Sequence, residues 1–213
     1  MDIIRAILDG IMMAVYFNGL AAVFILINSR YFFSSYPKSI QQAAPNPATK
    51  EEKKAGAKIM CFLLLPLFLY GAVSAVYAGT SDFWMLFLSG YINWMIVNFG
   101  DLMFLDGVLF SKQKTRVMLP GTEDHPDYET KNWMRKLALP EHLFFWPFLI
   151  VPLYALIQTG LALLIRHFGI LTFLGVRKGI THEIKPYHFK SPIPPRIPSF
   201  FSGLESNSVK TPS

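Results

Sequence analysis

Four polar side chains interrupt one long apolar stretch of this chain, residues 83–110. They are Asn93, Asn98, Asp101 and Asp106. The stretch is long and apolar enough to cross a bilayer. Polar and ionisable groups in a membrane span are costly, so they usually have partners or a function. These four residues therefore form the first candidate site, a polar patch on one span.

A helical period of about 100° per residue orders these residues around the helix axis. With Asn93 at zero, Asp101 falls near 80°, Asn98 near 140° and Asp106 near 220°, all about values from that period. Asn93, Asn98 and Asp101 are thus predicted to share one broad face, with Asp106 off to its side. Asp101 lies roughly 27 Å along the axis from the start of the span, close to the far interface.

A second group of candidate contacts lies in the following loop and at the start of the next apolar block. These residues are Glu123, His125, Asp127, Tyr128 and His142. Together with Asp101, Asp106 and Glu141 they could form a carboxylate and imidazole site for a hard metal or a proton relay. The spacing matches no known ligand pattern, so we predict no metal site and assign no catalytic residue. The alternative is that Asp101 makes a helix-end hydrogen bond or a salt bridge to a loop Lys or Arg.

The elements that must position these residues follow from composition. Of 213 residues, 52% are hydrophobic and only 16% charged, whereas a soluble domain carries about a quarter charged residues. We predict an all-α, polytopic membrane protein, a bundle of four transmembrane helices at about residues 3–27, 59–78, 83–106 and 143–165 in a single domain, 1–176. An alternative has three spans plus a re-entrant, proline-bent hairpin at 143–176. The basic tail, 177–213, is rich in Pro and Ser and is predicted to be disordered.

The distribution of basic residues predicts the orientation. Lys and Arg are frequent in loops 29–58 and 111–140, and the turn at 79–82 has none. The positive-inside rule then places both long loops in the cytoplasm and the N-terminus outside. The side of the tail stays open, because four spans leave it outside and the hairpin keeps it inside.

The net charge of +6 fits contact with anionic lipid headgroups, with the bilayer as the main partner. No nucleic-acid-binding motif occurs, so no nucleic-acid partner is predicted. The single cysteine, Cys61, excludes an intrachain disulfide and a Cys-based metal site. No phosphate-binding loop or hydrolase motif occurs, and no cofactor is predicted.

The segment Asn98-Phe99-Gly100-Asp101, then Asp106, a basic segment and Pro120-Gly121-Thr122-Glu123, resembles a pattern in a known group of proteins. These are small, uncharacterised bacterial integral membrane proteins with about four helices and an N-x2-D-x4-D segment followed by a PGTE-like turn. The resemblance covers roughly residues 90–165. It implies a four-helix protein of the bacterial cytoplasmic membrane and supplies no activity.

The sequence is compatible with two functions. The first is a non-enzymatic subunit or membrane scaffold, paired with another membrane protein or a second copy of itself. Small residues at every fourth position, Gly10, Ala14, Asn18 and Ala22, motivate it because they permit close helix contact. The alternative is a small transporter or membrane-embedded enzyme that uses the polar patch. A cavity bordered by both aspartates favours the alternative, and salt bridges to loop Lys or Arg favour the scaffold.

Overall fold

The computed structural model describes residues 2–112 and 114–169. Within these ranges the chain forms helices, turns and loops, with no strand. The predicted disordered tail, 177–213, lies outside the described residues.

Four helical segments are long and apolar enough to cross a membrane: Ile3–Ile27, Lys50–Tyr77, Phe83–Lys112 and Thr130–His167. This confirms the all-α fold with four spanning helices. The re-entrant hairpin is wrong, because Gly160, where it would turn, lies inside a helix that continues to His167. An uninterrupted apolar helix satisfies its own backbone hydrogen bonds, which a hairpin turn in lipid does not.

Two of the four segments are composed of several helical pieces. The first span is α1 (Ile3–Ile27) and the second is α3 (Lys50–Tyr77). The third combines α4 (Phe83–Gly100), η2 (Asp101–Leu109) and α5 (Phe110–Lys112). The fourth combines α7 (Thr130–Trp133), η4 (Met134–Ala138), η5 (Glu141–Ile150) and α8 (Val151–His167). The elements η2, η4 and η5 are π-helical, a wider winding with hydrogen bonds between residues five apart.

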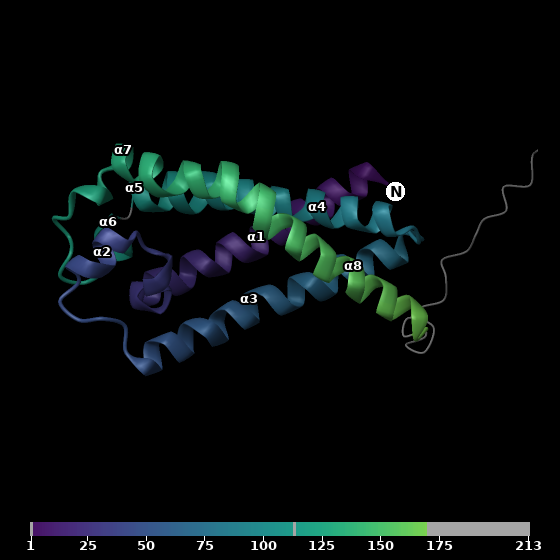
Figure 1. Ribbon diagram of the computed structural model, residues 1–213, viewed down its shortest axis with the longest axis horizontal. Helices are drawn as coiled ribbons and strands as arrows, with labels where there is room; N and C mark the ends of the chain where they lie inside the picture. Colours follow the sequence, from purple (N-terminus) through teal and green to yellow (C-terminus); the bar gives the residue numbers. More distant parts are fainter. Residues whose placement is uncertain (1, 113, 170–213) are drawn as a thin grey trace, which may run out of the picture. The chain divides into compact units, whose positions relative to one another are not determined.

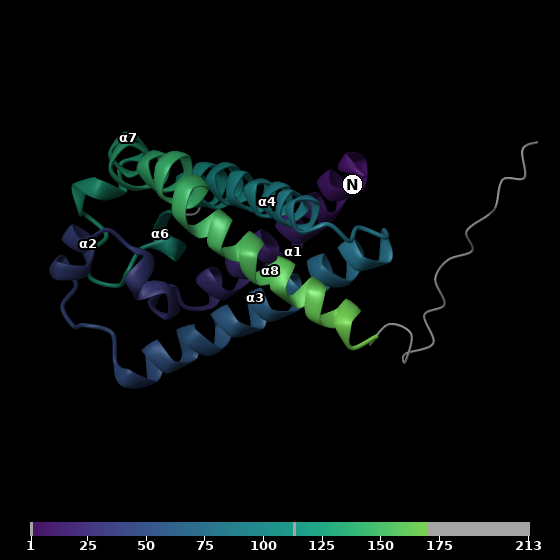
Figure 2. The same cartoon turned by 45° about the vertical axis from the view of Figure 1, so that its right-hand side comes forward.

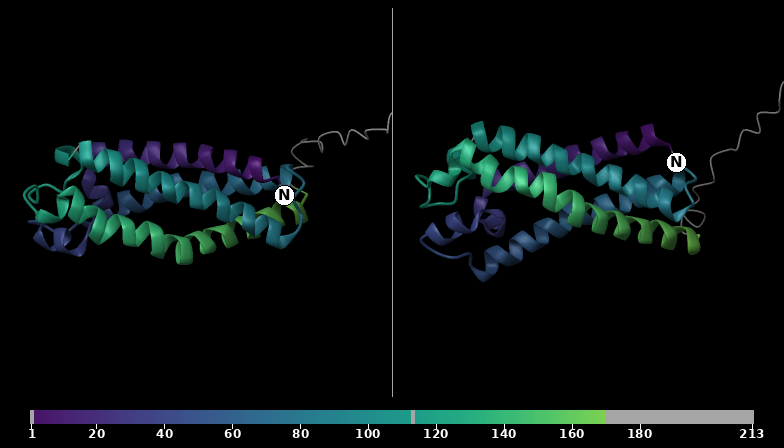
Figure 3. Two further views of the ribbon diagram at one scale, coloured as in Figure 1. Left: turned by 90° about the horizontal axis from the view of Figure 1, so that it is seen from above. Right: turned by 45° about the horizontal axis from the view of Figure 1, so that its top comes forward.

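The long helices pack side by side (Figure 1). Helix α4 packs against α1 and α8, and α3 packs against α8 and α1. Figures 2 and 3 show the same arrangement from other sides. We call the end of the bundle with the α3–α4 turn the turn end. The opposite end, with η1 (Ser29–Ser35), α2 (Lys38–Ala43), α6 (Lys114–Val117) and η3 (Pro126–Tyr128), is the loop end.

Small residues set the close approach of the helices, as the four-residue spacing predicts. A Cβ atom on Gly10 would lie 3.1 Å from the Cα atom of Asn93, and one on Gly100 would lie 2.6 Å from the Asn18 amide nitrogen. The α1–α4 contact therefore depends on glycine on both helices. Asn18 donates to the Val97 carbonyl oxygen at 3.4 Å, which is an interhelical hydrogen bond.

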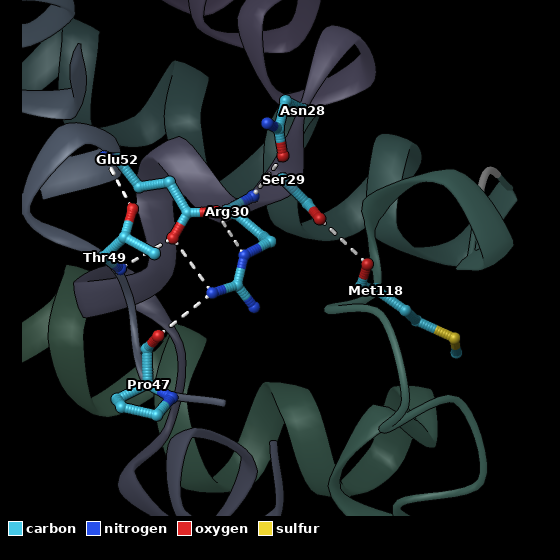
Figure 4. Close-up of polar contacts among 7 residues, drawn as sticks. All are labelled: Asn28, Ser29, Arg30, Pro47, Thr49, Glu52 and Met118. Atoms are coloured by element: carbon cyan, nitrogen blue, oxygen red, sulfur yellow. Dashed lines mark hydrogen bonds and ion pairs between the residues drawn. The ribbon is translucent and has the colours of Figure 1, made fainter. Parts of the chain in front are cut away.

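Polar contacts fasten the loop end to the start of α3 (Figure 4). Thr49 and Glu52 form a capping box, in which each side chain bonds to the other's backbone N–H. Arg30 donates to both carboxylate oxygens of Glu52 and to the Pro47 carbonyl oxygen. The Ser29 hydroxyl donates to the Met118 carbonyl oxygen at 2.9 Å, which joins the two long loops.

The third and fourth helices are longer than predicted, and this changes the environment of Trp133. The amphipathic pattern of residues 128–139 predicts an interfacial helix with Trp133 towards lipid. Instead Trp133 is buried, and its ring stacks on Phe110 with the centroids 4.0 Å apart. It belongs to the loop-end cluster, a set of buried apolar residues that also contains Tyr36, Ile40, Leu119, Tyr128 and Ala138. The aromatic partners in this cluster bury the indole more completely than the lipid interface can.

Candidate functional site

Asp101 and Asp106 lie on the π-helical segment η2. In an α-helix residues five apart point in different directions, but π-helical winding aligns residues i and i+5 along one side. Both aspartates border the same cavity. The expectation that Asp106 stands apart from Asp101 is therefore wrong, because it assumed the α-helical period.

The cavity has a volume of about 140 Å³ and is lined by the third and fourth segments, α1, α3 and η1. Segment η5 adds Glu141 and His142 to the two aspartates of η2. Neither Lys nor Arg is among the described residues that line it. Aromatic rings form much of the remaining wall: Phe17, Phe32, Tyr36, Phe110, Trp133 and Trp146. This volume holds several water molecules or a small ion, and it is below the 300–1,000 Å³ or so typical of larger ligands.

A hydrogen-bond network connects several side chains of the cavity wall. Asp106 accepts from the Trp133 indole at 2.9 Å through Oδ1, and its Oδ2 lies 3.0 Å from Nε2 of His142. Nδ1 of His142 lies 2.7 Å from Oδ1 of Asn98, whose amide nitrogen donates to the His142 carbonyl oxygen at 2.9 Å. His142 and Asn98 are both buried.

These contacts imply that the Asp106–His142 pair holds an additional proton. The Asn98 amide nitrogen already donates, so its oxygen must accept from Nδ1–H of His142. A neutral imidazole has only one N–H. The contact between Nε2 and Asp106 then needs a second proton, on the ring or on the carboxyl group.

The remaining two carboxylates differ in their partners. Glu141 accepts from the Trp146 indole at 3.1 Å, another pair five residues apart on a π-helical segment. The Asp101 side chain borders the cavity and has no hydrogen-bond or Lys or Arg partner within the described part of the chain. The predicted helix-end hydrogen bond or salt bridge of Asp101 is therefore not formed there.

Asn93 lies away from the cavity. The Asn93 amide forms hydrogen bonds through both of its polar atoms. Its nitrogen donates to the carbonyl oxygens of Ala6 and Ser89, and its oxygen accepts from Nε2 of Gln158. The polar patch predicted on one span is thus divided. Asp101, Asp106 and the supporting Asn98 belong to the cavity, and Asn93 belongs to a separate polar group.

The predicted loop contacts, apart from His142, organise the loop end. Glu123 accepts from the Gly121 N–H at 2.9 Å, and His125 Nδ1 accepts from the Asp127 N–H at 3.2 Å. Asp127 is buried and accepts from Lys136 and Ser39. None of these residues lines the cavity. A joint site of His125 and Asp127 with the aspartates of the third span is therefore wrong.

These loop contacts have electrostatic consequences. The Lys136 ammonium and then the Ser39 hydroxyl, both donors to Asp127, hold the pKa of that carboxyl below its ordinary value. Burial raises the pKa of Tyr128, whose hydroxyl accepts from the Leu119 N–H at 2.9 Å. The loop end is thus a folded region held by polar and aromatic contacts.

Sequence reasoning missed the aromatic residues that complete the site. Trp133 and Trp146 donate to Asp106 and Glu141, and Tyr36 closes the wall from the loop end. The pairs Asp101/Asp106 and Glu141/Trp146 share a spacing of five, which is the signal that could have indicated π-helical winding.

Within the described residues, no group of three or more His, Cys, Asp or Glu side chains lies close enough to hold a metal ion. No family model matches the chain, and no curated protein or solved structure shows significant similarity to it.

Proposed function

We propose that the protein is a small transporter and that the cavity is its binding site for a small organic ammonium ion. One observation carries this proposal: Asp101, Asp106 and Glu141 border one cavity, with no Lys or Arg side chain among its described lining residues. Carboxylates attract a cation, and aromatic faces stabilise an ammonium group by cation–π contacts.

The Asp106–His142 pair supports exchange of a cation for a proton. Its contacts hold one proton beyond those of a carboxylate and a neutral imidazole. A cation that enters the cavity repels this proton, and loss of the proton leaves a more negative site that holds the cation more firmly. The cavity is therefore suited to bind the two alternately.

The basic loops support an orientation in the bacterial cytoplasmic membrane with the loop end in the cytoplasm and the N-terminus outside. The cavity then lies on the cytoplasmic side, beneath the folded loops. The resemblance of the Asn98–Asp106 and Pro120–Glu123 segments to bacterial membrane proteins agrees with this location.

Tryptophan fluorescence tests the binding site, because Trp133 and Trp146 line the cavity. Methylammonium and tetramethylammonium chloride are titrated into the purified full chain in detergent, with sodium chloride at matched ionic strength as the salt control. Trp84 is largely exposed, so a Trp84→Phe background reduces the unrelated signal. We expect a saturable change with a Kd of about 1 mM or tighter for one of the two ions.

The matched variants are Asp101→Asn and Asp124→Asn. Asp101 borders the cavity and Asp124 is exposed at the loop end. We expect Asp101→Asn to weaken binding by about tenfold or more and Asp124→Asn to leave it unchanged. If the ammonium salts change the wild-type fluorescence no more than sodium chloride does, the transporter proposal is overturned. The scaffold hypothesis would then be favoured.

A further inference from the structure

The cavity opens on one side of the bundle, between α3 and the fourth segment. Its wall on α1 is closed, because the side chains of α1 that line it are each 6% exposed or less: Phe17, Ala21 and Ile25. Four lining residues on α3 and the fourth segment instead remain partly exposed: Met60, Leu137, Glu141 and Trp146. We call the opening that these four residues border the lateral mouth.

The lateral mouth follows from the course of α3 through the bundle. Helix α3 packs against α8, whereas η5 packs against α4, η4 and α8. Figures 1 and 2 show α3 close to the fourth segment at α8 and apart from it towards the loop end. The cavity lies at the level of η2 and η5, where α3 and the fourth segment have separated. The mouth therefore faces sideways, out of the bundle.

Protein contacts close the lateral mouth at both of its ends. The Tyr154 ring of α8 lies 6.1 Å from the Trp146 ring and 5.2 Å from the Phe68 ring of α3, centroid to centroid. Tyr154 thus joins α3 to the fourth segment on the turn-end side of the mouth. On the loop-end side, η1 packs against both α1 and α3. What remains open is the side between α3 and the fourth segment.

The surface around the lateral mouth is mostly apolar. Leu64 follows Met60 one helical turn on, along the same side of α3, and is also partly exposed. Leu65 beside it is 60% exposed. Of the four mouth residues only Glu141 is charged, and it also borders the cavity. An apolar surface beside a carboxylate suits a ligand that has a cationic end and an apolar chain.

Basic residues place the lateral mouth near the lipid headgroups. Lys58 is exposed two residues before Met60, and Arg135 is exposed two residues before Leu137. Lys and Arg side chains that flank a span lie at the membrane–water interface. An amphiphile in that leaflet holds its charged group at this level and its apolar part deeper. Its charged group therefore reaches the mouth from within the membrane.

We propose that the cation bound by this site is amphiphilic: an alkylammonium ion whose charged group occupies the cavity and whose alkyl chain lies in the lateral mouth. The cavity of about 140 Å³ has room for an ammonium group and no room for a long chain. The chain then rests on Met60 and Leu64, with its outer side against lipid. The inference rests on the proposed transporter function and narrows its substrate class.

Chain length in the ligand tests this inference. Tetramethylammonium and octyltrimethylammonium chloride are titrated into the full chain in the Trp84→Phe background, and the fluorescence of Trp133 and Trp146 is followed. Each buried methylene contributes about fourfold to affinity, and only part of the chain touches the protein, so we expect the octyl compound to bind about tenfold tighter or more. In Met60→Ser and Leu64→Ser the ratio of the two Kd values should fall about threefold or more, because the chain loses its apolar contact.

Met12→Ser is the matched control, since Met12 is 61% exposed on α1 and does not line the cavity. Its two Kd values should equal those of the wild type. Partition of the octyl chain into detergent is the same for every variant, so it cancels in the comparison. The inference is overturned if tetramethylammonium binds and the octyl compound binds no tighter, or if folded Met60→Ser and Leu64→Ser keep the wild-type ratio; the cavity proposal then stands. If neither ion binds, the transporter proposal itself is overturned.

Discussion

Oδ2 of Asp106, on the third spanning segment, lies 3.0 Å from Nε2 of His142, on the fourth. The contact joins the third and fourth spans at the point where both are π-helical. Because Asn98 holds the other ring nitrogen, His142 cannot rotate without breaking two interhelical contacts. The Asp106–His142 pair thus both shapes the cavity and stabilises the packing of the third span against the fourth.

His142→Ala should lower the free energy of unfolding by about 3 kcal/mol. The substitution leaves Oδ2 of Asp106 and Oδ1 of Asn98 without their partner inside the bundle, and removal of one member of a buried pair is strongly destabilising. Unfolding in a detergent mixture measures the change. His167→Ala, at the exposed end of α8, is the control and should change stability little. Equal stability of the two variants would contradict the paired role of His142.

Gly56→Ala and Gly19→Ala should have opposite effects, although both glycines lie inside helices. A Cβ atom on Gly56 would lie 2.2 Å from the Tyr31 carbonyl oxygen, which is backbone and cannot move cheaply. We expect this variant to lose about 1–3 kcal/mol of stability. A Cβ atom on Gly19 meets nothing within 4 Å, so alanine there should add about 0.5–1 kcal/mol. Thermal unfolding of both variants checks the signs, and stabilisation by Gly56→Ala would contradict the close contact.

Asp127 should stabilise the fold at neutral pH and lose this effect in acid. Its folded pKa lies below the ordinary value of 3.8, so the unfolded chain binds the proton more readily. The stabilisation is therefore present above the ordinary value and is lost as pH falls through it towards the lowered pKa. We expect wild type to exceed Asp127→Asn in unfolding free energy at about pH 7 and the difference to shrink towards about pH 3. Asp124→Asn, an exposed neighbour, should show no such pH-dependent difference.

Arg30 and Glu52 should be coupled energetically. Their side chains are 17% and 18% exposed, and two hydrogen bonds join them. Glu52→Gln keeps the capping box and removes the charge. A double-mutant cycle with Arg30→Gln should therefore give a coupling energy of about 0.5–3 kcal/mol. The same cycle with Glu51→Gln, an exposed neighbour, should give none, and equal coupling in the two cycles would show that the ion pair contributes nothing specific.

Local features of the sequence sufficed for the number of spanning helices and for their approximate positions, although the helices extend further into the loops than predicted. Four apolar blocks predicted four spans, because the cost of burying a helix in lipid is a sum over its own residues. The Thr49–Glu52 capping box and the Asp82 cap were also predictable, since each bond joins residues three apart. The close contacts at Gly10 and Gly100 follow from residue size alone.

The tertiary structure decided which polar residues meet. The spacing of five in Asp101/Asp106 and Glu141/Trp146 is compatible with π-helical winding but does not require it, because winding depends on the packing of neighbouring helices as well as on local preference. That winding places Asp101 and Asp106 on one cavity, and the inward turn of Trp133 supplies a donor to Asp106. Hydropathy marks Asn93, Asn98, Asp101 and Asp106 as costly in lipid. Only the contacts between distant helices divide them between the cavity and a separate polar group.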